Sequence, residues 1–513
     1  MEEWWEKVLV RFSDDPKDWW TVDDATKGTS ILGGTGSGKT SASGKVIAKQ
    51  FLKQGWGGLV LCAKTDEARL WEDYCRETGR SNDLIVFRKG SVHLEGKHKG
   101  ELMVFNPLHY EMNREGAGAK EAQNITNIFM NIYRMGNRVS GEGDSKEERF
   151  WDTALKRCLN RIIEIINYAG EELTYKNMVN VIFSAINITD EKINHVIDII
   201  SQEERGIYSN EGNDEDEYTF VKEKEYCLYC IAKALYNTKD CANTSVEVNT
   251  IELAYQYFSQ TLPAMGEKTR TTIVESFMGL AEPFLSGLLS IHFSGITNLK
   301  PEQTFTEKKI IILDFSVKEF LDAGIMAQCI FKLIFQQAIE RRDISKNPVP
   351  VFLWADEAQY FVNPYDQIFL TTARSSRAAT VFLSQNISNY LVIMGGSDGA
   401  KPKVDSFLGN LTTKIFHANS DAETNEYATR LIGQKIAFLG GVSTSSSLMS
   451  LGYQTTKSMN ASNLEQIQPR EFTLLRNGGQ KNNLEVDGVI FVTGKTWSSG
   501  TNFLKSIFKQ EFK

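Results

Sequence analysis

The sequence predicts an α/β fold, built on a mainly parallel sheet and interrupted by an all-α insertion. Short apolar runs have the length and composition of buried parallel strands, and helix-period segments such as 325–341 lie between many of them. The middle of the chain, over 111–300, has mostly helical patterning and few strand patterns. The expected strands are 58–62, 84–88, 309–315, 349–355, 380–384, 414–417 and 489–493.

Residues 33–40 read GGTGSGKT and fit the phosphate-binding pattern G-x-x-x-x-G-K-[ST], the Walker A motif. Apolar Ile31 and Leu32 precede this P-loop as the end of a strand, and a helix-compatible run over 41–52 follows it. Glycines allow backbone N–H groups to surround phosphate oxygens, and the helix N-terminus adds partial positive charge. We therefore expect ATP and Mg²⁺ as ligands. The expected nucleotide-binding residues are Gly33, Gly34, Thr35, Gly36, Ser37, Gly38, Lys39, Thr40 and Ser41.

Within this motif, Lys39 is expected to reach the β- and γ-phosphates. The Thr40 hydroxyl is expected to hold Mg²⁺. A chance glycine turn is the alternative interpretation, and the flanking strand and helix disfavour it.

The run VPVFLWADEAQYF over 349–361 supplies the second half of the predicted ATP site, the Walker B motif. Its apolar strand ends in Asp356, which we expect beside the P-loop, orienting Mg²⁺ through its water shell. Glu357, one residue further, is expected to be the catalytic base that polarises the attacking water. The alternative is a strand that ends in two solvated acids.

The run TVFLSQN over 380–386 brings Gln385 to the carboxyl end of a strand that we expect beside the Asp356 strand. An amide there can hydrogen-bond the attacking water or the γ-phosphate and so report the state of the nucleotide. A polar strand terminus without that role is the alternative.

The segment TTARSSR, over 371–377, carries Arg374 and Arg377. An arginine that reaches the γ-phosphate of a neighbouring subunit would stabilise the transition state, and Arg374 is our candidate for that finger. An ordinary surface ion pair is an equally good interpretation. Arg270 is a weaker candidate for the same task.

Lys39 and Asp356 stand 317 positions apart in the sequence, counted from residue 39 to residue 356. A compact nucleotide-binding core places its two motifs much closer, so the helical middle accounts for the separation. We interpret 1–110 and 301–513 as the two parts of a RecA-like nucleotide-binding domain and 111–300 as an all-α insertion domain. The helices expected in the insertion include 150–168, 177–188, 191–201 and 226–236.

The composition limits the class of protein. The 513-residue chain has a net charge of −8, so its surface as a whole does not attract nucleic acid, although a ring can carry basic residues on its pore loops. No apolar run approaches the length that spans a bilayer, and the start MEEWWEKVLVRF lacks a signal-peptide layout. We expect a soluble, cytoplasmic protein with no direct membrane span, which a partner must recruit if it acts at a membrane.

Two segments are expected to be exposed loops. The first, 203–217, has seven acidic residues and one arginine, and an acidic recruitment surface is the alternative there. The second, 440–454, is rich in serine and glycine.

Cys227 and Cys230 form a CxxC with Cys241 nearby, but no second pair or neighbouring histidine completes a zinc set, so we expect core cysteines there. With six histidines and no H-x-x-x-H pair, histidine-based catalysis has little support.

The motifs together resemble the type IV secretion coupling ATPases (TraG/TraD-like), the conjugative DNA-transfer proteins of the FtsK/HerA-like superfamily. The resemblance rests on GGTGSGKT, WADEAQYF and TARSSRAATVFLSQN, with local similarities at 105–108 (FNPL), 150–151 (FW), 420–433 and 469–478, and it extends from about residue 28 to the end. It implies a hexameric ring whose channel passes DNA, with ATP bound between subunits and an all-α domain that reads the cargo machinery. It also implies that Gln385 is the sensor and Arg374 the finger.

The chain departs from this family at its start. Family members usually begin with membrane-spanning helices, whereas about 30 residues precede the P-loop here. We therefore expect the protein to act through a separate membrane subunit or in another DNA-handling system, such as phage defence. The start carries Trp4, Trp5, Trp19 and Trp20, which form either a buried aromatic cluster or a surface for a partner.

The expected function is that of an ATP-driven DNA translocase or coupling motor. The alternative is an ATPase that assembles or remodels a protein complex, for example in a phage-defence or DNA-processing system, without moving DNA. A nucleotide-gated scaffold with little turnover is a third interpretation, which the intact Lys39, Asp356 and Glu357 disfavour.

Overall fold

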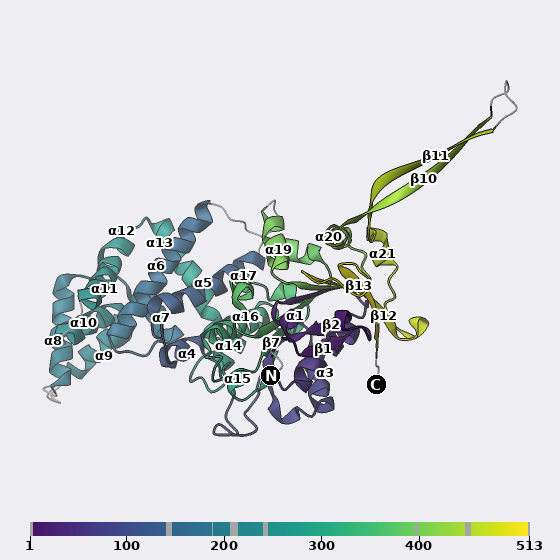
Figure 1. Cartoon of the computed structure of the whole chain (residues 1–513). Helices are drawn as coiled ribbons and strands as arrows, with labels where there is room; N and C mark the ends of the chain where they lie inside the picture. The colour runs from purple at the N-terminus through teal and green to yellow at the C-terminus, as the bar shows by residue number, and fades with distance from the viewer. Residues whose placement is uncertain are drawn as a thin grey trace. The chain divides into compact units, whose positions relative to one another are not determined.

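The computed structural model describes residues 4–139, 146–186, 188–205, 214–239, 245–394, 399–446 and 453–510 (Figure 1). Nine strands form one sheet in the order β13-β12-β9-β3-β8-β7-β4-β6-β5. These strands are β3 (Thr29–Leu32), β4 (Gly57–Leu61), β5 (Leu84–Arg88), β6 (Ile310–Asp314), β7 (Val351–Ala355), β8 (Ala378–Ser384), β9 (Thr413–Phe416), β12 (Glu485–Val492) and β13 (Phe503–Lys509). All seven strands expected from the sequence are among them, and the predicted α/β fold is confirmed.

The centre of the sheet is parallel. Strand β3 pairs parallel with β8 and β9, and β7 pairs parallel with β8 and β4. Leu32 lies opposite Ser384, and Ala355 lies opposite both Phe382 and Leu61. The carboxyl ends of β3, β4, β7 and β8 therefore meet at one edge of the sheet. Strands β12 and β13 are antiparallel additions beside β9.

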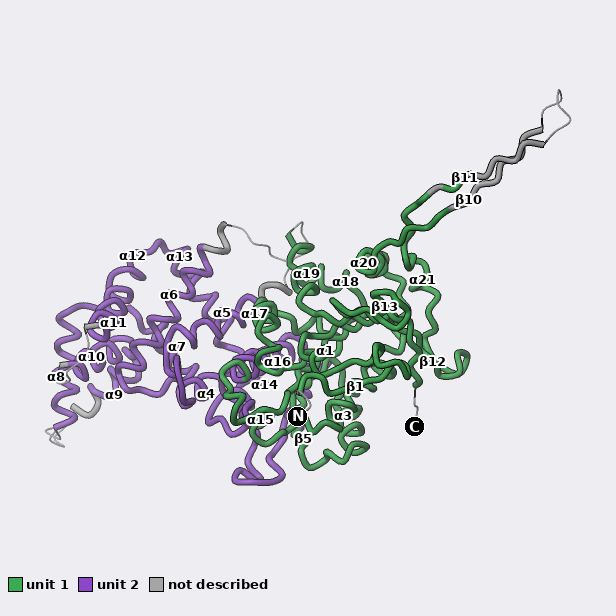
Figure 2. Tube along the Cα trace, viewed as in Figure 1, with its two compact units in different colours: residues 1–85, 303–312, 339–513 green, residues 86–302, 313–338 purple. Residues whose placement is uncertain are grey.

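The chain divides into two compact units, shown in green and purple in Figure 2. The first comprises Met1–Ile85, Gln303–Ile312 and Ile339–Lys513, and the second comprises Val86–Glu302 and Leu313–Ala338. Helices of the first unit are α1 (Val22–Thr26), α2 (Lys45–Lys53), α3 (Thr65–Glu77), α15 (Gln303–Thr306), α17 (Pro364–Thr372), α18 (Ile387–Ile393), α19 (Ala400–Gly409), α20 (Ala422–Ile432) and α21 (Pro469–Thr473). The expected helix 325–341 lies within α16 (Val317–Arg341).

The second unit contains helices between residues 111 and 299, and the described residues there form no strand. Its helices are α4 (Pro107–Asn113), α5 (Ala122–Val139), α6 (Lys146–Tyr168), α7 (Tyr175–Ser184), α8 (Asp190–Glu204), α9 (Asp214–Lys224), α10 (Tyr226–Lys239), α11 (Ser245–Gln256), α12 (Leu262–Ala264), α13 (Glu267–Ala281) and α14 (Gly287–His292). On α6, Leu155, Leu159, Ile162 and Ile166 are buried, and their spacing of three and four residues places them on one face of the helix.

The prediction of a loop over 440–454 is wrong over most of its length. Strands β10 (Gln434–Ser446) and β11 (Tyr453–Glu465) pair antiparallel as a two-stranded ribbon (Figure 1). Serine and glycine favour loops, but here the backbone pairs across two strands instead. Residues 447–452 lie outside the described part of the chain.

The expected loop 203–217 is also shorter than predicted. Helix α8 ends at Glu204 and α9 begins at Asp214, so the last four acidic residues of that segment belong to a helix. Acidic residues at a helix N-terminus are favoured by the helix dipole, which explains why this charged run is not all loop. Residues 206–213 lie outside the described chain.

The tryptophans near the start have different environments. Trp20 is buried in the core, where its Nε1 donates to Thr413 Oγ1 at 3.1 Å and its ring stacks near Phe51. Trp5 is 37% exposed and lies edge-on to Trp4. Only Trp20 therefore belongs fully to a buried cluster. No helix in the described residues combines the length and apolar character needed to cross a bilayer.

Candidate nucleotide-binding site

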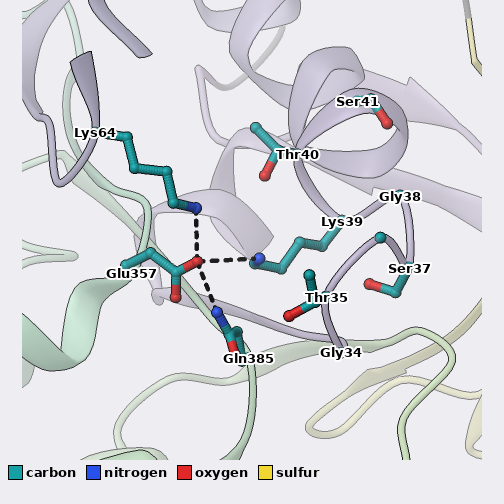
Figure 3. A pocket seen from close by; sticks show the side chains of 11 residues that line it. Gly34, Thr35, Ser37, Gly38, Lys39, Thr40, Ser41, Lys64, Glu357 and Gln385 are labelled. Carbon is teal, nitrogen blue, oxygen red and sulfur yellow. Dashed lines mark hydrogen bonds and ion pairs between the residues drawn. The ribbon is translucent and has the colours of Figure 1, made fainter. Parts of the chain in front are cut away.

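The P-loop connects β3 to α2 and curls around a pocket of about 240 Å³ (Figure 3). Gly36 and Gly38 have φ angles of 73° and 85°, in the left-handed region that favours glycine. At Gly38 a Cβ atom would also lie 2.6 Å from Val486 Cγ2, so a larger residue would be strained and would have to displace that side chain. A π-helical turn, Thr40–Gly44, follows the loop and leads into α2, where the sequence predicted regular helix from residue 41.

The pocket wall contains most of the predicted site residues. Its lining residues are Gly34, Thr35, Gly36, Ser37, Gly38, Lys39, Thr40, Ser41, Lys64, Glu357 and Gln385. Gly33 is not part of this wall, because it lies at the end of β3 and donates its N–H to the Ser384 carbonyl at 3.3 Å.

The two acidic residues of the second motif meet the P-loop. The Thr40 hydroxyl donates to Asp356 Oδ2 at 2.6 Å. Lys39 Nζ lies 3.9 Å from Asp356 Oδ1 and 3.6 Å from Glu357 Oε1. Strand β8 lies between β3 and β7 in the sheet, so the ends of both flanking strands face one site. The two motifs therefore close on the same pocket within the first unit.

Glu357 is the most heavily contacted acid of the site. It is 2% exposed and has φ and ψ of 47°, a left-handed conformation that turns the chain directly after β7. Its Oε1 accepts hydrogen bonds from Lys64 Nζ at 2.8 Å and Gln385 Nε2 at 3.2 Å, as the dashed lines in Figure 3 mark. Its Oε2 accepts from Gln359 Nε2 at 3.1 Å.

These contacts decide the protonation state of Glu357. Burial by itself would raise the pKa of this carboxyl group. The positive charge of Lys39 and the hydrogen bonds from Lys64 and Gln359 outweigh burial and lower the pKa to about 2. Glu357 is therefore a carboxylate at neutral pH.

Gln385 reaches the pocket from the end of β8, which pairs parallel with β7 as predicted. Its backbone is held in place by Asn419, whose Nδ2 donates to the Gln385 carbonyl at 2.9 Å. The side-chain amide thus lies between the P-loop and Glu357, a position suited to contact a bound phosphate or water.

The three candidate arginines do not line the pocket of their own chain. Arg374 follows α17, and its Nε forms an ion pair with Asp23 Oδ1 at 2.9 Å while the side chain is 62% exposed. Arg377 lies over the Trp4 ring at 4.2 Å and donates to the Pro348 carbonyl at 2.6 Å. Arg270 is exposed on α13 of the second unit. A finger role for any of them requires a second subunit.

The structure adds Lys64, which the sequence analysis missed. Lys64 stands three residues beyond the end of β4, which pairs parallel with β7, and it lines the pocket. The sequence does show that Lys64 is a cation that follows an expected strand, 58–62. The parallel pairing of that strand with β7 places Lys64 at the same edge of the sheet as Glu357. Lysine after a strand is common, so only the sheet order gives this residue significance.

The sequence analysis also missed His417, which contacts the turn that follows the P-loop. Its Nδ1 donates to the Asp487 carbonyl at 2.8 Å, which leaves Nε2 to accept from the Ser43 hydroxyl at 2.7 Å. Burial lowers the pKa of His417 to about 4, so the ring is neutral. The neutral imidazole fixes the first turn after the P-loop.

The donor atoms fit Mg²⁺. The Thr40 hydroxyl and the Asp356 carboxylate are hard oxygen ligands 2.6 Å apart, and Mg²⁺ is usually held by one or two such groups together with phosphate oxygens and water. Among the described residues no group of three or more His, Cys, Asp and Glu could hold a metal without such help. Cys227 and Cys230 are free thiols in the helical core, in agreement with the core interpretation.

Comparisons with known proteins find one matching family model and several solved structures of the same fold. Residues 350–476 match the family model described as "TraM recognition site of TraD and TraG". No curated protein sequence matches the chain. Over residues 350–476, the family match confirms the resemblance to the TraG/TraD-like coupling ATPases stated above.

Solved structures of the plasmid coupling protein TrwB share the fold across the whole chain. The unbound monoclinic form of TrwBdeltaN70 has a TM-score of 0.53 at 11% identity, covering 99% of this chain and 89% of that one. TrwB with the non-hydrolysable GTP analogue GDPNP has a TM-score of 0.52 at 11% identity, covering 99% and 90%. TrwB with ADP and Mg²⁺ has a TM-score of 0.51 at 11% identity, covering 99% and 89%.

Proposed function

We propose that this chain, similar to the TraG/TraD-like coupling ATPases in its fold and over residues 350–476, is an ATP-hydrolysing ring motor that translocates or couples DNA. One observation carries the proposal. Lys39 and Thr40 of the P-loop, Glu357 after β7 and Gln385 after β8 line one pocket of about 240 Å³, and Asp356 accepts a hydrogen bond from the Thr40 hydroxyl. This is the arrangement that phosphoryl transfer to water requires, because positioning and charge stabilisation do most of the catalytic work.

Each residue has a distinct role in the proposed reaction. Lys39 binds the β- and γ-phosphates, and the P-loop backbone holds their oxygens. Thr40 and Asp356 would hold Mg²⁺, which when bound neutralises charge on the phosphates. Glu357 polarises the attacking water as general base, and Gln385 orients that water or contacts the γ-phosphate.

The proposed assembly is a homo-oligomeric ring, a hexamer, with ATP between subunits and DNA in the channel. Arg374 would then act as a finger on the γ-phosphate of the neighbouring subunit. The family model is named for TraM recognition in TraD and TraG, so a surface within residues 350–476 is proposed to bind a membrane-associated or effector partner protein. We propose a cytoplasmic location.

A second candidate function is supported by the net charge of −8. An acidic chain is less suited to bind DNA over a broad surface. A ring that assembles or remodels a protein complex, without moving DNA, would need the same ATP site and no basic channel.

ATP hydrolysis with and without DNA distinguishes the two functions. We expect single- or double-stranded DNA to stimulate hydrolysis severalfold, and the stimulation to weaken steeply as salt rises. Lys39→Ala is the control that reports contaminating ATPases. A ring that is shown to be assembled, yet hydrolyses ATP at the same rate with DNA at low salt, would favour the remodelling function. Imaging the oligomer with ATP and a DNA duplex then tests whether DNA threads the centre.

A further inference from the structure

We propose that Lys64 is a second phosphate-contacting lysine, which pairs with Glu357 until a triphosphate enters and then moves to its terminal phosphate, freeing the base. The inference rests on the proposed ATP hydrolysis at this site and adds to it a residue that distinguishes ATP from ADP. The observation behind it is the ion pair between Lys64 Nζ and Glu357 Oε1 at 2.8 Å, within the pocket that the P-loop encloses (Figure 3).

The backbone of Lys64 is fixed at the rim of this pocket. Strands β4 and β7 are parallel neighbours with Leu61 opposite Ala355, so the residues that follow them meet at the same edge. The Glu67 carboxylate accepts hydrogen bonds from the N–H groups of Ala63 at 2.7 Å and Lys64 at 3.3 Å, at the start of α3. The Lys64 side chain therefore starts from a defined point on the wall of the pocket.

The contacts of Glu357 occupy an oxygen atom that a general base needs. Its Oε1 accepts from Lys64 Nζ at 2.8 Å and from Gln385 Nε2 at 3.2 Å, and Lys39 Nζ lies 3.6 Å away. A general base must come within hydrogen-bonding reach of the water that it activates. Withdrawal of Lys64 would open one side of Oε1 to that water.

The mobile partner of the pair is Lys64. Its side chain is 35% exposed, whereas that of Glu357 is 3% exposed and also held by Gln359. Burial would lower the pKa of Lys64, but the hydrogen bond and charge of Glu357 outweigh burial and raise it, so the ammonium group stays charged. A charged amine on a flexible four-carbon stem, beside a pocket that admits a triphosphate, is attracted to the larger negative charge.

The contact falls on the terminal phosphate because of where Lys64 lies. Lys64 borders the pocket on the side of Glu357, the residue that would activate water for attack on the γ-phosphate. ADP lacks that phosphate, so Lys64 has little to contact and remains with Glu357. The structure thus assigns Lys64 a positioning role for the base and a binding role for ATP alone.

Binding of fluorescent N-methylanthraniloyl ATP and ADP tests this role, with kcat and KM measured for ATP on the same proteins. The variants are Lys64→Gln, which keeps a hydrogen-bond donor for Glu357 but removes the charge, and Lys64→Met. We expect both to bind the ATP derivative about tenfold more weakly and the ADP derivative within about twofold, with a reduced kcat. Lys64→Arg should restore part of the ATP preference, and Lys53→Met, an exposed lysine on α2, should change neither affinity.

Three outcomes are distinguishable. Equal weakening of both nucleotides, or no change, would show that Lys64 is only a structural partner of Glu357 and would overturn the inference. If Lys64→Met does not fold, Lys64→Gln decides, since it retains the contact. If the wild-type chain itself binds neither nucleotide, the proposed ATPase function fails, and the inference fails with it.

Discussion

The Thr40 hydroxyl donates a 2.6 Å hydrogen bond to Asp356 Oδ2 across 316 positions of sequence. At the same edge of the sheet, Lys39 Nζ lies 3.9 Å from Oδ1 of this carboxylate. We propose that this hydroxyl and this carboxylate would hold Mg²⁺ together with phosphate oxygens and water.

Thr40→Ala is therefore expected to raise the Mg²⁺ concentration that half-saturates hydrolysis by about tenfold or more, because a direct ligand is removed. Nucleotide binding in the presence of a chelator should change little. Titration of ATPase activity with Mg²⁺ measures the shift. Thr250→Ala is the matched control, since this threonine of α11 does not line the pocket and its hydroxyl donates to the Val246 carbonyl at 2.8 Å. An unchanged Mg²⁺ requirement in Thr40→Ala would remove Thr40 from the ligand set.

Glu357→Gln should bind ATP and hydrolyse it at least about a hundredfold more slowly, because it removes the base and keeps the shape. The amide can still accept from Lys64 and Gln385, so the pocket should stay assembled. Fluorescent ATP binding and steady-state phosphate release measure the two effects. Turnover within twofold of wild type would mean that another group activates the water.

Comparison of Arg374→Ala with Asp23→Asn distinguishes two roles of Arg374, an arginine finger on a neighbouring subunit and an ion pair with Asp23. Both changes break the pair between Arg374 Nε and Asp23 Oδ1, but only the first removes a possible finger. We expect Arg374→Ala to lower turnover about a thousandfold in the assembled ring with nucleotide binding retained. Asp23→Asn should hydrolyse ATP like wild type.

Mixing subunits tests whether the arginine acts across an interface. Arg374→Ala subunits keep an intact pocket, and Lys39→Ala subunits keep an intact arginine, so a mixed ring should recover part of the lost activity. If the mixture stays inactive, or if Asp23→Asn loses as much turnover as Arg374→Ala, the ion-pair interpretation holds.

The buried, neutral His417 leads us to expect that the free energy of unfolding depends on pH. Its pKa is lowered from 6.5 to about 4 by burial, so between these values the unfolded chain binds more protons than the folded one. Stability should therefore fall as the pH falls from 6.5 to 4, by at most about 3 kcal/mol from this group. Thermal unfolding of wild type and His417→Gln across this range isolates the contribution, because the variant should lack it. Parallel curves for the two proteins would contradict the prediction.

Much of the site could be predicted from the sequence because its parts are local motifs. The P-loop needs glycines at positions where φ is positive, and Gly36 and Gly38 occupy them. The acids follow an apolar strand directly, so their place at the edge of a sheet follows from strand polarity. Serine and glycine between 440 and 454 misled the prediction because local composition does not report cross-strand pairing.

By itself, the sequence determined the order of strands and helices, the P-loop and the acids and glutamine that end two strands, because these depend on neighbouring residues. Only the tertiary structure decided that β3, β8, β7 and β4 are neighbours in the sheet. This strand order determines which side chains from distant parts of the sequence come into contact. Lys64 and His417 became part of the site through this arrangement, since nothing in their own segments distinguishes a lysine or histidine at a strand end from any other. Contact between such residues depends on how the sheet is assembled, which no local pattern encodes.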